Sequence, residues 1–198
     1  MAMKRCYVHR SRFDEVVAGL SAILDKQVIG DGLLPETTMG PMNNPRQHRV
    51  VELMREEAKL MGADLRDFGQ VPDQDLFDQG YFLRPALIVD ADKNMSAVKD
   101  EQFGPLLPIM PFDTEEEAIA IANDTPYGLT NYVQTQDPAR ANRMARALRS
   151  GMVEMNGKPR SAGSPFGGMK QSGNGREGGI WGIEDFLEVK AVSGWAAE

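Results

Sequence analysis

The chain contains 198 residues, of which 41% are hydrophobic and 26% are charged, as in an ordinary globular protein. It carries 29 acidic and 22 basic side chains, a net charge of −7, and has no basic block, which argues against nucleic-acid and anionic-membrane partners. A single cysteine excludes an intrachain disulfide, and with only His9 and His48 beside it the usual zinc spacings are also excluded. The sequence shows neither a membrane-spanning run nor a signal-peptide core, so we expect a cytoplasmic protein.

The first part of the chain predicts one strand and two helices. Residues 6–9 form a short β-type run, and Ser11 is placed to cap a helix that continues to residue 24. Asn44 followed by Pro45 predicts the start of a second helix, which Gly62 ends. The polar segment 64–78 is predicted as a loop. The apolar stripe of the second helix consists of Val50, Leu53, Met54, Ala58 and Met61.

The rest of the chain continues the alternation of strands and helices. Thr114 and Glu117 form a capping box at the start of another helix. Strands are predicted at 85–89, 106–112, 130–135, 152–155 and 186–192, and a further helix at 139–148. This order predicts an α/β domain with a largely parallel sheet.

A glycine-rich stretch runs from Pro165 to Gly179 and contains a literal G-x-G-x-x-G at Gly173, Gly175 and Gly178. A dinucleotide-binding loop of that pattern follows a strand and is followed by an acidic residue about 20 positions later. Here no strand leads into the stretch, and the chain ends at Glu198. The stretch is therefore predicted to be a tight crossing of backbones where side chains do not fit.

Two further features carry both a chemical and a structural interpretation. Cys6 could be a nucleophile, with Lys4 and Arg5 nearby, but it alternates with Val8 in a β-type run, which favours a structural cysteine. Glu101 and Phe103 precede an apolar run, where a carboxylate can bind sugar hydroxyls and a ring can pack on a flat ligand. Taken alone, they favour the structural interpretation, a turn glutamate and a core phenylalanine.

Several motifs, taken together and in order, resemble the C-terminal half of the NAD(P)-dependent aldehyde dehydrogenase family. The most specific are the E-x-F-G-P run at Glu101–Pro105 and the P-F-G-G-x-K-x-S-G-x-G-R-E-x-G run at Pro165–Gly179. The others are Lys4–His9 with Phe13–Glu15, Gly40-Pro41 with Asn44 and Gln47, Gly80–Pro85, Asn123–Thr125 with Tyr127–Leu129, and Gly151–Asn156.

The resemblance implies a fold and a set of roles. Residues 1–185 would form part of a three-layer α/β catalytic domain without its Rossmann cofactor domain, and residues 186–198 the C-terminal strand of an oligomerisation arm, so a homo-oligomer is expected. Glu101 would hydrogen-bond the nicotinamide ribose of NAD or NADP, and Phe103 would pack beside the nicotinamide. Phe166 would line the aldehyde pocket, and the glycine-rich stretch would cross under the substrate tunnel.

The resemblance also implies what this chain does not carry. The family's catalytic cysteine lies five residues before the arginine equivalent to Arg5, a position that falls just before Met1. Cys6 is out of register with it. The nucleophile that forms the thiohemiacetal, the general base, the oxyanion-hole asparagine and the cofactor domain would all lie upstream. We therefore expect no catalytic residue and no metal in this chain, no turnover by it alone, and weak or no binding of NAD or NADP.

Two alternatives to a partial aldehyde dehydrogenase stay open. The chain could be a stand-alone, non-catalytic subunit that pairs with itself or with full-length relatives, or an unrelated α/β binding module with a glycine-rich loop. Residues 157–164 are small and polar with two cations, Lys158 and Arg160. This composition is compatible with a polar or anionic aldehyde but favours a solvated loop.

Overall fold

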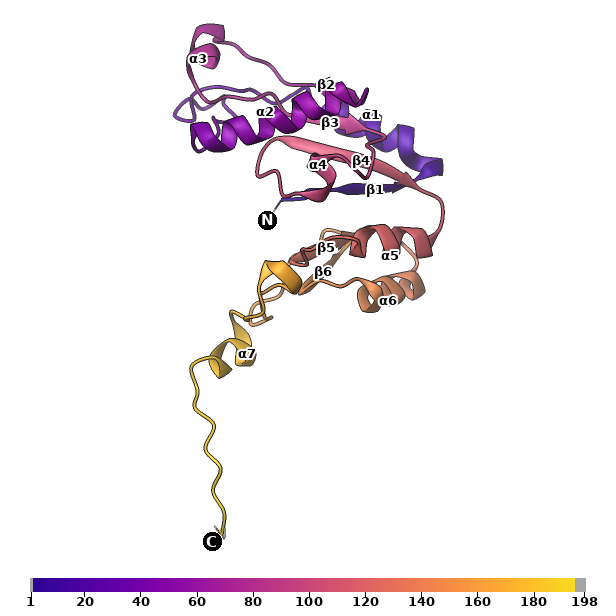
Figure 1. The fold of residues 1–198 in the computed structure, drawn as a ribbon, viewed down its shortest axis with the longest axis vertical. Coiled ribbons are helices and arrows are strands. Elements are labelled where there is room, and N and C mark those ends of the chain that lie inside the picture. Colours follow the sequence, from indigo (N-terminus) through magenta and orange to yellow (C-terminus); the bar gives the residue numbers. More distant parts are fainter. Residues whose placement is uncertain (1, 195–198) are drawn as a thin grey trace. The chain divides into compact units, whose positions relative to one another are not determined.

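The computed structural model describes residues 2–194 and divides the chain into two compact units, residues 1–118 and 119–198 (Figure 1). Strands and helices alternate along both units, which confirms the predicted α/β class. Within residues 2–194, no helix combines the length and the apolar character needed to cross a membrane.

The first unit is built on a four-stranded sheet with the order β1-β4-β3-β2. Its strands are β1 (Cys6–His9), β2 (Asp64–Asp67), β3 (Ala86–Val89) and β4 (Leu106–Phe112). The neighbours β1, β4 and β3 run parallel, as predicted, whereas β2 pairs with β3 antiparallel. The sheet is therefore largely parallel with one antiparallel edge strand.

The edge strand β2 corrects the prediction of a loop over residues 64–78. Three of its four residues are charged and exposed, which is common for a strand at a sheet edge and hides the strand pattern in the sequence. The same segment holds a short helix, α3 (Gln74–Gln79), whose start is capped by the Asp73 carboxylate, 2.9 Å from the backbone nitrogen of Leu76.

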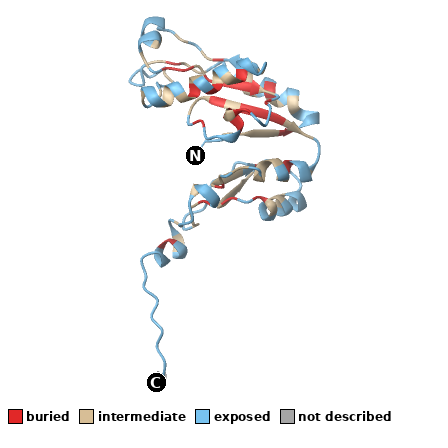
Figure 2. Cartoon of the chain, viewed as in Figure 1, coloured by how far each residue is buried: buried red, intermediate tan, exposed pale blue. Residues whose placement is uncertain are grey.

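Helices cover both faces of this sheet and make three layers. α2 (Pro45–Leu60) and α4 (Ser96–Lys99) pack on one face against Ala86, Ile88 and Met110. α1 (Phe13–Leu24) packs on the other face against Val8 and Ile109. Because successive side chains of a strand point to opposite faces, β3 and β4 supply both layers of the core and contain many of its buried residues (Figure 2).

The helix starts follow the sequence only in part. Asn44 caps α2 as predicted, its side-chain oxygen 2.9 Å from the backbone nitrogen of Gln47. Ser11 does not cap α1, because it lies in a short 3₁₀ turn, η1 (Arg10–Arg12), where its hydroxyl bonds His9. The buried stripe of α2 contains Val51 rather than Leu53, which is half exposed.

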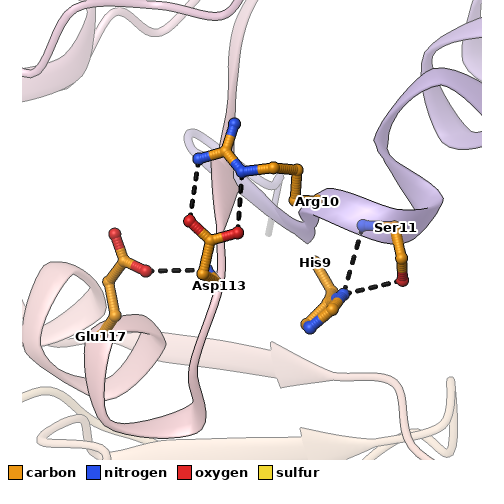
Figure 3. Close-up of polar contacts among 5 residues, drawn as sticks. All are labelled: His9, Arg10, Ser11, Asp113 and Glu117. Atoms are coloured by element: carbon orange, nitrogen blue, oxygen red, sulfur yellow. Dashed lines mark hydrogen bonds and ion pairs between the residues drawn. The ribbon is translucent and has the colours of Figure 1, made fainter.

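A bidentate ion pair joins the turn after β1 to the turn after β4. The Arg10 guanidinium donates to both carboxylate oxygens of Asp113, at 2.7 and 3.0 Å, and the backbone N–H of Asp113 donates to Glu117 (Figure 3). Arg10 holds the pKa of the Asp113 carboxyl below its ordinary value. The pair therefore contributes stability above the carboxyl's unfolded pKa, and that contribution is lost as the pH falls through the folded pKa.

The second unit contains a two-stranded parallel sheet of β5 (Thr130–Val133) and β6 (Met152–Met155). Its helices are α6 (Pro138–Ala147), the one-turn η2 (Lys170–Ser172) and α7 (Gly179–Glu184), and the helix α5 (Glu115–Asn123) contains the division between the units. Asp137 caps α6, and Thr114 accepts the backbone N–H of Glu117 at the start of α5, as the capping box predicts. The sequence did not predict α7.

No strand is assigned to residues 186–194 within the described chain, although 186–192 is predicted as one. Figure 1 shows this segment (yellow) as an extended trace after α7. An extended segment becomes a strand only by pairing with another one, so its role as the strand of an oligomerisation arm stays a prediction. Residues 195–198 of that predicted arm lie outside the described residues.

Candidate functional site

Glu101 and Phe103 lie in the first unit, on the turn between α4 and β4. Both side chains are exposed, Phe103 to 64%, so the alternative of a core phenylalanine is wrong. Phe103 has a φ of 34°, which is a strained conformation for a bulky residue and costs about 1–3 kcal/mol. Such strain persists only where the surroundings hold it, and it is often found at ligand-binding positions.

Lys4 completes this side of the candidate site. Its ammonium nitrogen lies 4.9 Å from the centroid of the Phe103 ring, a cation–π contact. Partial burial lowers the pKa of Lys4 from its ordinary value, and the nearby Glu101 carboxylate partly opposes that shift. The structure thus brings Lys4, Glu101 and Phe103 together at the start of β1 and of β4.

Gln102, between the two predicted residues, was missed by the sequence analysis. It is fully buried, and its amide nitrogen lies 2.9–3.3 Å from the backbone oxygens of Lys4, Ala97 and Leu106. A polar residue directly before an apolar run carries no distinctive signal by itself.

Cys6 lies on β1 in register with Ile109 of β4 and packs against the core on the α1 face. Burial raises the pKa of its thiol to about 11. Because the thiolate is the reactive form, a raised pKa makes this cysteine a poor nucleophile near neutral pH. The structural interpretation of Cys6 is thus favoured by its packing and its chemistry.

We expect the Cys6 thiol of the native chain to resist alkylation. At about pH 8, a thiol of pKa near 11 reacts at least about 100-fold more slowly than an unperturbed one, because far less thiolate is present. The measurement is the rate of labelling by iodoacetamide, with the urea-unfolded chain as the reference. Native labelling as fast as unfolded labelling would contradict the burial argument.

Phe166 lies in the second unit, where it exchanges two backbone hydrogen bonds of 2.7 Å with Glu177. The Arg160 guanidinium stacks on the Phe166 ring, 5.4 Å from its centroid, and donates to the backbone oxygen of Ser164 at 2.7 Å. Among the described residues, no carboxylate forms an ion pair with Arg160. A guanidinium that forms no ion pair within residues 2–194 therefore lies over the side chain predicted to line an aldehyde pocket.

The glycine-rich stretch is a crossing of backbones, as predicted. A Cβ on Gly151 would lie 1.7 Å from the backbone oxygen of Gly167, and one on Gly168 would lie 2.6 Å from the backbone oxygen of Ser172. The Arg176 guanidinium fastens the stretch by donating to the backbone oxygens of Gly168 and Gly175 at 2.7 and 2.8 Å.

Lys170, within the same stretch, ties it to the end of α5. Its ammonium donates to the backbone oxygens of Asn123 and Thr125, both at 2.9 Å, near the C-terminal end of α5. The unpaired carbonyls and partial negative charge at a helix end favour a cation there. Three anchors, Lys170, Arg176 and the pairing of Phe166 with Glu177, thus fix the segment that carries the predicted pocket residue.

Two cavities accompany these features. One, of about 320 Å³, lies in the second unit and is lined by Phe166, the glycine-rich stretch, Arg176 and Asp185. A larger one, of about 440 Å³, lies in the first unit beside α2, between charged side chains of both signs, and includes none of the predicted site residues in its lining. Over residues 2–194, no group of three or more potential metal-ligating side chains gathers.

Comparison with known proteins places these features in a family. The model of the aldehyde dehydrogenase family matches residues 1–192. A 3-succinoylsemialdehyde-pyridine dehydrogenase from a Pseudomonas species is 40% identical over 98% of this chain, and a glutarate-semialdehyde dehydrogenase from Pseudomonas putida is 40% identical over 94%. The chain covers 40% and 38% of these two relatives.

Solved structures agree with the sequence matches. The crystal structure of an aldehyde dehydrogenase from Bartonella henselae matches 96% of this chain with 39% identity and a TM-score of 0.89. An aldehyde dehydrogenase variant from Pseudomonas syringae, in complex with NAD+ and octanal, matches all of it with 39% identity and a TM-score of 0.90. Each match takes in 40% of the solved chain, so this chain spans well under half the length of the proteins it is similar to.

Proposed function

Because the chain belongs to the aldehyde dehydrogenase family, we propose that it forms part of an enzyme that oxidises an aldehyde to a carboxylic acid with NAD or NADP. The observation that carries this proposal is the family match over residues 1–192, together with the exposed pair Glu101 and Phe103 on one strained turn. In this proposal Glu101 and Phe103 contact the nicotinamide nucleoside and Phe166 lines the aldehyde pocket. Another segment supplies the nucleophile.

Glu101 and Phe103 fit a nicotinamide nucleoside. The exposed carboxylate can accept hydrogen bonds from both ribose hydroxyls, and the exposed ring offers a flat apolar surface beside the base. NAD or NADP, when bound, supplies the acceptor for the aldehyde's hydride. In this chain Glu101 would orient that acceptor, and Phe103 would exclude water from its face.

We assign Phe166 to the aldehyde side. Arg160, stacked on its ring and lacking an ion-pair partner among the described residues, supports a substrate that carries an anionic group as well as an aldehyde. Relatives at 40% identity are named for semialdehydes, including a mouse mitochondrial succinate-semialdehyde dehydrogenase. In the chimera described next, a carboxylate-bearing aldehyde should outperform its neutral analogue, and Arg160→Ala should remove that preference.

A chimera tests the proposed function. In the chimera, this chain replaces the part of the Bartonella henselae enzyme that it matches, and the rest of that enzyme is kept. The chain and the part it replaces are 39% identical, with a TM-score of 0.89. We expect aldehyde-dependent formation of NADH or NADPH by the chimera. A folded chimera that binds the cofactor and yet forms no reduced product with any aldehyde would overturn the proposal.

We also propose that the chain associates through the segment from α7 onward. Its apolar side chains are exposed, Val189 to 99%. They are Ile180, Trp181, Ile183, Phe186, Leu187, Val189 and Val192. Several exposed apolar side chains on one segment favour association, with a second copy or a full-length relative. A cytoplasmic location stays a prediction from the sequence.

Sedimentation of the purified chain checks this proposed association. We expect dimers or larger species at micromolar concentration, and a shift toward monomer when Phe186 and Leu187 are both replaced by serine. The matched control replaces Leu33 and Leu60, which are also exposed but belong to the first unit. A wild-type chain that sediments as a monomer at all concentrations would contradict the proposal.

A further inference from the structure

Gln102 is the only buried side chain of the turn that carries Glu101 and Phe103. Its exposed fraction is 0%, whereas both neighbours point into solvent. A buried amide must be hydrogen-bonded to be tolerated, and within the described chain this one is bonded through its nitrogen. Since Phe103 has a strained φ of 34°, the contacts of Gln102 are the natural place to look for what holds the turn.

The amide nitrogen of Gln102 gathers three separate segments. Its acceptors are the backbone oxygens of Lys4 at 2.9 Å, Ala97 at 3.3 Å and Leu106 at 3.0 Å. Lys4 leads into β1, Ala97 belongs to α4 and Leu106 begins β4. The contact with Lys4 spans 98 residues of sequence, so it joins the turn to the segment just before β1.

The backbone of Gln102 is held by a separate contact. Its carbonyl accepts a hydrogen bond of 2.9 Å from the Gln47 side chain of α2. Gly104 packs so closely on α2 that a Cβ there would lie 2.5 Å from a methyl of Val51. The turn is therefore fastened through its side chain and through its main chain, and only Glu101 and Phe103 are left to face a ligand.

The three carbonyl oxygens around the amide nitrogen of Gln102 exclude the orientation in which the amide oxygen and nitrogen are exchanged. Its oxygen, Oε1, is buried without a hydrogen-bond partner in the described chain. Exchanging the oxygen and the nitrogen would turn that acceptor toward three carbonyl oxygens and would lose all three bonds. The orientation is thus set by the three acceptors, and the buried oxygen remains as its cost.

We propose that Gln102 is a positioning residue, which fixes Glu101 and Phe103 relative to Lys4 and so sets the geometry of the nicotinamide side. The role of Gln102 in catalysis rests on the proposed function. Its role in holding the turn rests on the hydrogen bonds alone. Gln102 touches neither substrate nor cofactor in this account. It acts by tying the turn to the backbone that precedes β1.

The test uses the 198-residue chain and follows the contact between the Lys4 ammonium and the Phe103 ring. NMR should detect this contact as a cross-relaxation signal between the Lys4 ε-methylene protons and the ring protons. Gln102→Met keeps the length of the side chain and removes its donors. We expect the signal to be lost in Gln102→Met. The matched control is Ile88→Val, a fully buried core position, which should lower stability and leave the signal in place.

The outcomes separate the possibilities. Loss of the signal in Gln102→Met and its retention in Ile88→Val would support positioning. Retention in both, or loss in both, would overturn it, because Gln102 would then be dispensable or merely part of the core. If Gln102→Met does not fold, Gln47→Met, which removes the bond to the Gln102 carbonyl, decides by the same comparison. An inactive chimera would sink the proposed function and would leave this result standing.

Discussion

Gly151→Ala is expected to unfold the crossing of the second unit, at a cost of at least about 3 kcal/mol. The added Cβ would lie 1.7 Å from the backbone oxygen and 2.6 Å from the carbonyl carbon of Gly167, and 3.0 Å from the Cα of Gly168. All three neighbours are backbone atoms, so a change of rotamer cannot relieve the overlap. Either the glycine-rich stretch moves away or the pairing of β5 with β6 breaks.

The measurement for Gly151→Ala is amide hydrogen exchange over residues 128–155, which contain both strands of that sheet. The control is Gly175→Ala in the same glycine-rich stretch, where the nearest atom to an added Cβ is a side-chain oxygen of Asp185 at 3.7 Å. Exchange should accelerate in the first variant and stay near wild type in the second. Equal protection in both variants would contradict the close approach of these backbones.

Glu101→Gln is expected to reduce kcat/KM for the cofactor in the chimera by about 10- to 100-fold. The reason is that a hydrogen bond to a charged group is worth about 1.5–3 kcal/mol, and the amide gives up that charge. The exposed turn position leaves the fold little affected, because the Glu101 side chain forms no part of the core. The loss should appear with every aldehyde tested, since the residue is assigned to the cofactor.

Steady-state kinetics with the cofactor varied measures this effect. Glu36→Gln, an exposed glutamate on a loop of the same unit, removes the same charge elsewhere and should leave the rate unchanged. If both variants behave alike, the turn does not hold the cofactor. A loss of kcat/KM with only some aldehydes would indicate that Glu101 contacts the substrate and not the cofactor.

Local signals in the sequence predicted most of the fold. The helix starts at Asn44 and Thr114 and the backbone crossing of the stretch 165–179 depend on residues with a distinct local chemistry, and the structure confirms each of them. The antiparallel strand β2 was not predictable in this way. Its four residues alternate in no apolar pattern, and pairing with β3, not local preference, makes it a strand.

The candidate site was predictable only through motifs. Glu101, Phe103 and Phe166 were named because ordered motifs resemble a family, whereas their residue types alone also allow structural roles. Lys4 and Gln102 were missed as site residues because their contacts join segments about 100 residues apart, which no local pattern reports. The likeness to solved structures shows the fold and leaves the roles of these residues to experiment.

The measurement that tests the central claim most directly is aldehyde-dependent reduction of NAD or NADP by the purified 198-residue chain, beside its Cys6→Ala variant. We propose that this chain supplies the cofactor and pocket walls and that Cys6, whose thiol pKa is raised to about 11 by partial burial, is not the nucleophile. The proposal predicts no turnover by either protein. Turnover by the wild-type chain that disappears in Cys6→Ala would contradict it and make Cys6 the nucleophile.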